Sequence, residues 1–258
     1  MGICYQSIIM AGTKKKSGAE VPNSKGGCRG GCIKSIFLVY LLIAIFYFGV
    51  HVYFMWQPVG NPDGVTQQVM NAQVAGVNIF PAVQAYPMAH VAGRTEIMDG
   101  RPIPAPMIKE RLRLAVERKY PLTFREEEIN AWLGRRLDVR QGGELAPFVK
   151  VRGLWVDFKQ DQIELIIERE LPWGKVHVTS LFMGFEQGKR GFTISRHSCH
   201  IGQVRLPGGF ARLLMPAFVN LAQELEDELK PYYSMRINDV RVEDGKITLD
   251  PRLPDERL

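Results

Sequence analysis

The longest uninterrupted apolar segment of the chain is residues 36–56, IFLVYLLIAIFYFGVHVYFMW, in which only Gly49 and His51 are not hydrophobic. At about 1.5 Å per helical residue, a segment of this length covers roughly 30 Å, the hydrocarbon thickness of a bilayer. A helix of a soluble core shows a polar stripe, and this one has none. The pattern predicts a transmembrane helix that ends at the interfacial residue Trp56, before Pro58.

Basic residues flank this segment on one side only. The tail of residues 1–35 holds six Lys and Arg and one Glu, or +5 of the formal net charge of +6, and the next Lys or Arg is Arg94. This asymmetry predicts a cytoplasmic amino terminus and an extracytoplasmic remainder. Residues 54–56, Phe-Met-Trp, offer no small-residue cleavage site, so we expect an uncleaved signal anchor. Because the rest of the chain is near neutral, no nucleic-acid partner is expected.

Residues 57–104 carry repeated Pro and Gly, few charges and no sustained period. This composition predicts a linker or stalk. The stretches 65–74 and 79–91 are apolar enough to lie along the domain or the membrane surface, and this alternative stays open.

From residue 105 the pattern predicts a folded domain that extends to residue 250. Apolar positions first recur at helical spacing, at Ile108, Leu112 and Ala115. A second helix is expected over 124–137, begun by a capping box from Thr123 to Glu126. The carboxylates of Glu126, Glu127 and Glu128 are interpreted as complements of the helix dipole.

Beyond residue 142 the apolar period falls to two, which predicts antiparallel strands. Strands at 148–158 and 163–171 place three apolar pairs on one face, with a bulge at Gly153: Leu154–Ile167, Val156–Leu165 and Phe158–Ile163. The other face carries Asp157 and Glu164 and is expected to contact water. A second hairpin is expected over 175–185 and 192–201.

A broad apolar face over 209–230 predicts the longest helix of the domain. A last hairpin turns at Asp244-Gly245, a pair that suits a type I′ turn, and residues 251–258 form a polar tail. The predicted fold class is α+β: one amino-terminal transmembrane helix, then an antiparallel sheet packed on a long amphipathic helix.

The sheet and this helix are expected to enclose an apolar ligand site. The candidate lining residues come from one strand and from the helix: Leu181, Met183, Phe185, Phe210, Leu214, Phe218 and Leu221. Such a site binds by non-directional burial and needs few polar groups.

Motifs of nucleotide binding, hydrolysis or zinc catalysis do not occur in the sequence, so no catalytic residue and no cofactor is predicted. Cys199 is the single cysteine after the apolar segment, which excludes a disulfide within the outer domain. If Glu186 pairs with Gly191, His177 lies opposite His200; these two are weak metal candidates without a third ligand. An enzymatic role would rest on Cys199 and His200.

Three segments resemble the small extracytoplasmic domains of the YpmS-like and YceB-like kind, which are tethered by one span or a lipid. They are LTFREEEINAWLGRRL at 122–137, IGQVRLP at 201–207 and VRVEDGKITL at 240–249. The resemblance implies the shape of a tubular lipid-binding domain at a bacterial inner membrane. Two functions follow as expectations: binding of a lipid or other apolar ligand, or a structural or protein-interaction role in the cell envelope.

Overall fold

The computed structural model describes residues 29–58, 63–86, 90–136, 139–143, 146–188, 191–207, 220, 221, 223, 227 and 237–256. Most of the predicted cytoplasmic tail lies outside these residues. The chain divides into two compact units, Met1–Phe46 and Tyr47–Leu258.

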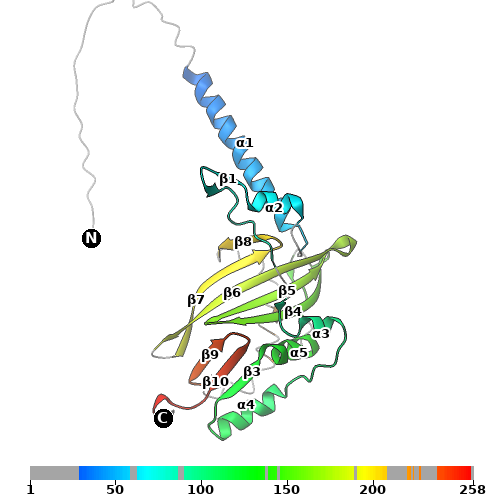
Figure 1. Ribbon diagram of the computed structural model, residues 1–258, viewed down its shortest axis with the longest axis vertical. Helices are drawn as coiled ribbons and strands as arrows, with labels where there is room; N and C mark the ends of the chain where they lie inside the picture. The colour runs from blue at the N-terminus through cyan, green and yellow to red at the C-terminus, as the bar shows by residue number, and fades with distance from the viewer. Residues whose placement is uncertain are drawn as a thin grey trace, which may run out of the picture. The chain divides into compact units, whose positions relative to one another are not determined.

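Helix α1, Arg29–Met55, contains the long apolar segment and begins seven residues before its predicted start at 36 (Figure 1). Within it, Lys34–Met55 is long and apolar enough to cross a membrane, and it is the one such helix among the described residues. The large apolar side chains between residues 36 and 46 are exposed, so the first unit offers its apolar surface outward.

The last part of α1, Tyr47–Met55, belongs to the second unit and packs against it. The side chain of Phe54 is 2% exposed and is part of the domain's core. The backbone N–H of Gln203 donates to the carbonyl oxygen of Phe54 at 3.1 Å, and Nε2 of His177 contacts the carbonyl oxygen of Met55. The carboxyl end of the predicted span therefore lies against the folded domain.

The domain is built on a five-stranded antiparallel sheet with its strands in chain order. They are β4 (Lys150–Lys159), β5 (Gln162–Glu170), β6 (Val176–Gly188), β7 (Gly191–Ile201) and β8 (Val204–Pro207). The short helix η3, Pro172–Gly174, connects β5 to β6.

The predicted register of the first hairpin is confirmed. Leu154, Val156 and Phe158 pair with Ile167, Leu165 and Ile163, and the register shifts between Val151 and Gly153. The glycine is required there, because a Cβ at Gly153 would lie 2.8 Å from the ring of Trp155.

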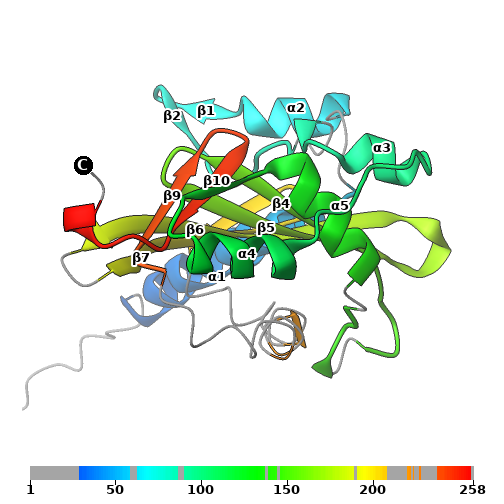
Figure 2. The same cartoon turned by 90° about the horizontal axis from the view of Figure 1, so that it is seen from below.

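A second antiparallel sheet has the order β3-β10-β9: β3 is Leu122–Arg125, β10 is Lys246–Asp250 and β9 is Asp239–Glu243. The predicted pairing of β9 with β10 is confirmed. Strand β9 crosses β4 to β7 of the larger sheet (Figure 2). In the turn between β9 and β10, Gly245 has a positive φ, at 72°, and Asp244 does not. The predicted type I′ turn is therefore wrong, since that type needs a positive φ at both positions.

The predicted capping box is also wrong. Thr123 lies in β3, where its hydroxyl contacts that of Thr248 at 2.9 Å, and helix α5 starts only at Glu126. The carboxylate of Glu128 accepts a hydrogen bond from the N–H of Arg125 at 2.9 Å. The bond from a glutamate back to the start of the helix therefore forms two residues after the predicted pair, Thr123 and Glu126. The pairing with β10, remote in sequence, selects a strand for residues 122–125.

Helix α4, Ile108–Glu117, buries Ile108, Leu112 and Ala115, as its spacing predicts. Helix α5, Glu126–Arg136, lies within the predicted 124–137 and packs beside β4. The short helix η6, Pro254–Glu256, ends the described chain, and Lys119 forms an ion pair with Glu256.

The stretch 57–104, expected as a linker or stalk, contains ordered elements where it is described. They are α2 (Gly64–Met70), β1 (Gln73–Val74), β2 (Val77–Asn78) and α3 (Arg94–Met98). Phe80, Val83, Tyr86 and Val91 are buried. This stretch packs on the domain, and its lack of a period reflects irregular backbone over a sheet.

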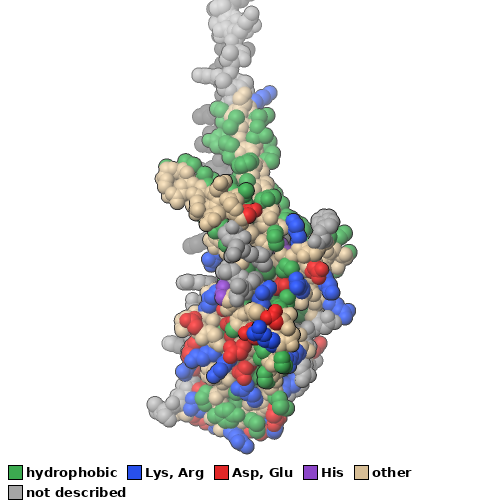
Figure 3. Space-filling view, turned by 45° about the vertical axis from the view of Figure 1, so that its right-hand side comes forward, with side chains coloured by type: hydrophobic (Ala, Val, Ile, Leu, Met, Phe, Trp, Pro, Cys, Tyr) green, Lys and Arg blue, Asp and Glu red, His purple; other side chains and the backbone are tan. Residues whose placement is uncertain are grey.

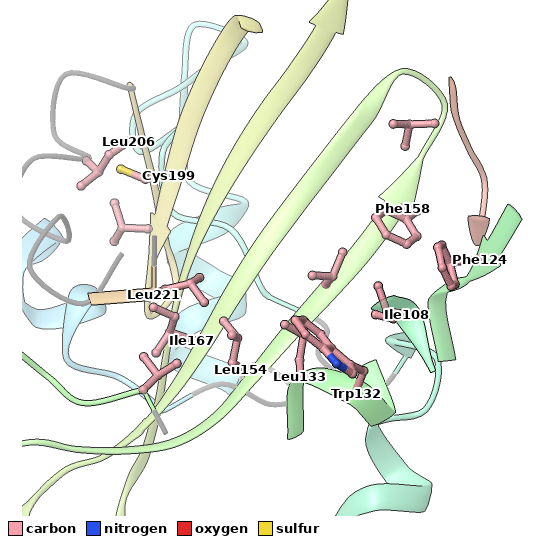
Figure 4. Packing of buried hydrophobic residues seen from close by; sticks show 14 of the residues in the cluster. Ile108, Phe124, Trp132, Leu133, Leu154, Phe158, Ile167, Cys199, Leu206 and Leu221 are labelled. Carbon is pink, nitrogen blue, oxygen red and sulfur yellow. The ribbon is translucent and has the colours of Figure 1, made fainter. Parts of the chain in front are cut away.

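The main core lies between the two sheets and is shown in Figure 4, where Leu221 is drawn with Ile167 and Leu154. A smaller cluster on the other face of the larger sheet joins Trp155, Ile166 and Val178 to Tyr86 and Val91. Of the predicted helix 209–230, only residues 220, 221, 223 and 227 are described, and they are helical.

Candidate functional site

The candidate apolar site lies on the core-facing side of β5, β6 and β7. One row of paired residues crosses four strands in register: Val156, Leu165, Leu181 and Cys199. The outer two are buried, at 4% and 0% exposure, whereas Leu165 and Leu181 between them remain partly exposed. In the neighbouring row, Ile163 and Met183 pair and are partly exposed too. The middle of this face is therefore apolar, and the described residues cover it incompletely.

The structure describes some of the predicted lining residues and not others. Leu181 and Met183 lie on this face, and Leu221 is 2% exposed in the core cluster that Leu181 packs against. The backbone of Phe185 pairs with Ile194 after a register shift. The other predicted residues, Phe210, Leu214 and Phe218, lie outside the described residues.

The proposed pairing of His177 with His200 is wrong. Glu186 pairs with Thr193 at the turn, and a further register shift between Met183 and Phe185 pairs His200 with Ser180. His177 pairs with Arg169 on the other side of β6. Because three positions along a strand separate His177 from Ser180, the two histidines lie on opposite faces of the sheet. In the part of the chain that the structure describes, no three His, Cys, Asp or Glu residues form a group able to hold a metal ion.

Both histidines are buried, and burial lowers the pKa of each to about 4. They are neutral at pH 7. Burial also raises the pKa of the Cys199 thiol to about 11, so the sulfur is protonated. A protonated thiol at 0% exposure is a poor nucleophile, and the geometry gives no support to thiol chemistry here.

The opposite face of the sheet, expected to contact water, is instead covered by Tyr86 and by residues 90–97. Asp157, Glu164 and Glu168 are buried there, at 6%, 2% and 0% exposure. The hydroxyl of Tyr86 donates to Oε1 of Glu164 at 2.6 Å, and Nη2 of Arg94 donates to Oε2 of Glu168 at 2.9 Å. The prediction failed because these partners come from a segment with no regular pattern.

The buried carboxylates of this face form hydrogen bonds and ion pairs, and the network reaches solvent at Lys159. Nζ of Lys159 lies 2.8 Å from Asp157 and 3.7 Å from Glu164, and its side chain is 46% exposed. Burial raises the pKa of the Glu164 carboxyl. The apolar pair Trp155 and Ile166 on the same face was the sequence signal that this side is covered.

Both edges of the five-stranded sheet are covered at described positions. At the β4 edge, Asn130 accepts from the N–H of Val156 at 2.7 Å and donates to its carbonyl at 2.9 Å, and Glu126 accepts from the N–H of Phe158 at 2.8 Å. At the β8 edge, Val204 forms a bridge with Val83. Helix α5 thus supplies side-chain partners where a further strand would bind.

Glu126 lies in the first turn of α5, where it was expected to complement the helix dipole, and its buried side chain has a further role. Its carboxylate accepts hydrogen bonds from the N–H groups of Ala92 and Phe158, and burial raises the pKa of the Glu126 carboxyl.

No protein-family model, no curated protein and no solved structure matches the chain.

Proposed function

We propose that this chain is a single-pass membrane protein whose extracytoplasmic domain binds an apolar ligand, a lipid acyl chain, on the core-facing side of its larger sheet. One observation carries the proposal. Leu165 and Leu181 stay partly exposed at the centre of a row whose outer members, Val156 and Cys199, are buried. Exposed apolar surface in the middle of a core face is unfavourable in water, and a ligand that covers it gains the burial free energy.

The chemistry of the surrounding residues suits a hydrocarbon. The row is formed by aliphatic side chains, and the thiol of Cys199 is neutral. An acyl chain needs no polar partner, which agrees with the absence of a catalytic motif in the sequence. The resemblance to small tethered lipid-binding domains supports the same reading.

The membrane anchor is supported by helix α1 and by the charges beside it. Lys34–Met55 has the length and composition of a span. The excess of Lys and Arg in residues 1–35 favours a cytoplasmic amino terminus, which puts the domain outside the cytoplasm at the inner membrane.

Photo-crosslinking of the full chain in detergent micelles tests this function. A phospholipid that carries a diazirine in its acyl chain is activated, and labelled peptides are located by mass spectrometry. We expect label on β5 and β6 as well as on α1. The substitution Leu181→Trp fills the exposed centre of the row and should abolish the β5 and β6 label. Phe182→Trp adds the same ring on the opposite face and serves as the control.

Label confined to α1 in the unchanged chain would show that lipid contacts only the anchor. The alternative, a protein-interaction role in the cell envelope, would then gain support from a stoichiometric cross-linked protein. The covered positions on β4 and β8 direct that alternative to exposed faces and away from the sheet edges.

A further inference from the structure

The β1–β2 hairpin has a tip that is unusual for a surface in water. Gln73 pairs with Asn78 and Val74 with Val77, and the two turn residues, Ala75 and Gly76, have φ values of 50° and 79°. Positive φ at both positions is the type I′ signature, for which Asn-Gly or Asp-Gly is preferred. Alanine in place of Asn or Asp leaves the whole tip, Val-Ala-Gly-Val, without a polar side chain.

The hairpin lies in a long uncharged region of the chain. No Asp, Glu, Lys or Arg occurs in residues 64–93, although 23% of the whole chain is charged. Four large aliphatic side chains of this region are exposed: Val65, Val74, Val77 and Ile79. Figure 3 shows a lobe on which green and tan surface predominates.

Contacts within the second unit fix this hairpin beside the last turns of α1. The ring of Phe80, two residues after β2, stacks on Tyr47 with 5.4 Å between centroids and lies 5.8 Å from the ring of His51. The amide of Asn78 donates to the carbonyl of Met70 at 2.8 Å and so ties the hairpin to α2.

The length of the helix sets the depth of these contacts. The apolar residues that precede Tyr47, from Ile36 to Phe46, extend about 16 Å, roughly half of the hydrocarbon thickness. A helix that spans the bilayer therefore needs Tyr47 and His51 inside the membrane as well. The ring of Phe80 contacts both of these rings, so the segment attached to it lies at the same level.

We infer that the β1–β2 hairpin, with Val65 and Ile79 beside it, inserts into the extracytoplasmic leaflet next to α1. The inference rests on the proposed membrane anchor and adds a second contact with the same bilayer. The ladder bonds of the hairpin satisfy the backbone groups that face the partner strand, which lowers part of the cost of leaving water. The aliphatic tip reaches the boundary of headgroups and acyl chains, to a depth of about 5–10 Å.

Spin-label depth measurements on the full chain in lipid nanodiscs test the inference. The native cysteines are first replaced, by Ser at Cys4, Cys28 and Cys32 and by Ala at Cys199. A nitroxide is then attached at one position at a time: Val77→Cys in the hairpin, Leu41→Cys in α1 or Lys246→Cys in β10. Collision rates with oxygen, which enters lipid, are compared with those of a water-soluble nickel chelate.

We expect the label at 77 to show an oxygen-to-nickel collision ratio several-fold above the ratio at 246. The ratio at 77 should lie closer to the ratio at 41 than to the ratio at 246. A label at 77 that matches 246, while 41 reports lipid, would overturn the inference and leave the anchor standing. Aqueous values at all three positions would overturn the anchor and the inference with it. A Val74→Asp substitution in the Val77→Cys chain should lower the ratio at 77 and leave the ratio at 41 unchanged.

Discussion

The hydroxyl of Tyr86 donates a 2.6 Å hydrogen bond to Oε1 of Glu164, and both side chains are buried. The bond joins the irregular segment that covers the sheet to β5. It satisfies a carboxylate oxygen in a position that water hardly reaches, and it positions the ring of Tyr86 against that of His200, 5.1 Å away between centroids.

Replacement of Tyr86 by Phe should therefore lower the free energy of unfolding by about 1–3 kcal/mol, because a buried acceptor loses its donor. Denaturant unfolding of the full chain in micelles, followed by Trp fluorescence, measures this change. Tyr40→Phe removes the same hydroxyl from a residue that is 70% exposed and should leave the free energy of unfolding unchanged. Equal effects of the two substitutions would contradict a role for the bond.

The pH dependence of stability should report the two buried histidines. The pKa of His177 and His200 is about 4 in the folded protein and near 6.5 when unfolded. Between these values the unfolded chain binds protons that the folded chain does not bind, so the free energy of unfolding falls as pH decreases from about 6.5 to about 4. Unfolding titrations of the full chain at several pH values measure this fall.

A double variant, His177→Gln with His200→Gln, should show a smaller fall over the same range. Burial raises the pKa of Glu126 and Glu164, which acts in the opposite sense above about 4.5. Both carboxyls are present in both proteins, so their contribution cancels in the comparison. An unchanged fall in the double variant would show that other groups carry the pH dependence.

Asn130 closes the edge of β4, and its loss should be costly. The side chain is 0% exposed and makes three hydrogen bonds, two to Val156 and one to the carbonyl of Ala92 at 2.7 Å. Asn130→Ala should lower the free energy of unfolding by about 2–4 kcal/mol, since buried backbone groups are left without partners. Light scattering of the variant should also show aggregation through the uncovered edge.

The exposed Asn71 provides the control for that substitution, because Asn71→Ala should change the free energy of unfolding by no more than about 0.5 kcal/mol. If Asn130→Ala changed the free energy of unfolding equally little, the hydrogen bonds of the Asn130 side chain would not be what stabilises the β4 edge.

The parts of the fold that the sequence predicts are those with a local period. The pairs across β4 and β5 follow from alternation, and the bulge follows from Gly153. Alternation also puts Leu181 and Met183 on one face of β6, as predicted. Leu221, from the predicted helix 209–230, is in the core cluster.

The failures have a common physical cause, which is a partner remote in sequence. The local sequence around Thr123 predicts a helix cap, but the structure pairs Thr123 with Thr248 of β10. Asp157 and Glu164 have the pattern of a face in water, but Tyr86 and residues 90–97 cover them. The predicted pairing of His177 with His200 failed for a different reason: the turn pairs Glu186 with Thr193 and not with Gly191, and the register shift around Gly184 moves the pairing by one more residue.

The end of helix α1 is held against the sheet by a close approach that only glycine permits. Gly202 has a φ of 57°, and a Cβ there would lie 2.5 Å from the carbonyl oxygen of Met55 and 2.9 Å from that of Phe54. Gly245 has a φ of 72° but nothing within 4 Å of the same position. The two residues share a backbone conformation and differ in the approach of α1.

Substitution of each glycine by Ala separates these effects. Gly245→Ala should lower the free energy of unfolding by about 1–2 kcal/mol through the left-handed backbone alone. Gly202→Ala should cost roughly 1–3 kcal/mol more, because the backbone of α1 must also move. Hydrogen exchange of the full chain in micelles should then show faster exchange of the amides near Met55 in Gly202→Ala, and no such change in Gly245→Ala. Equal unfolding free energies and unchanged exchange at the helix end would contradict the close packing of α1 on the sheet.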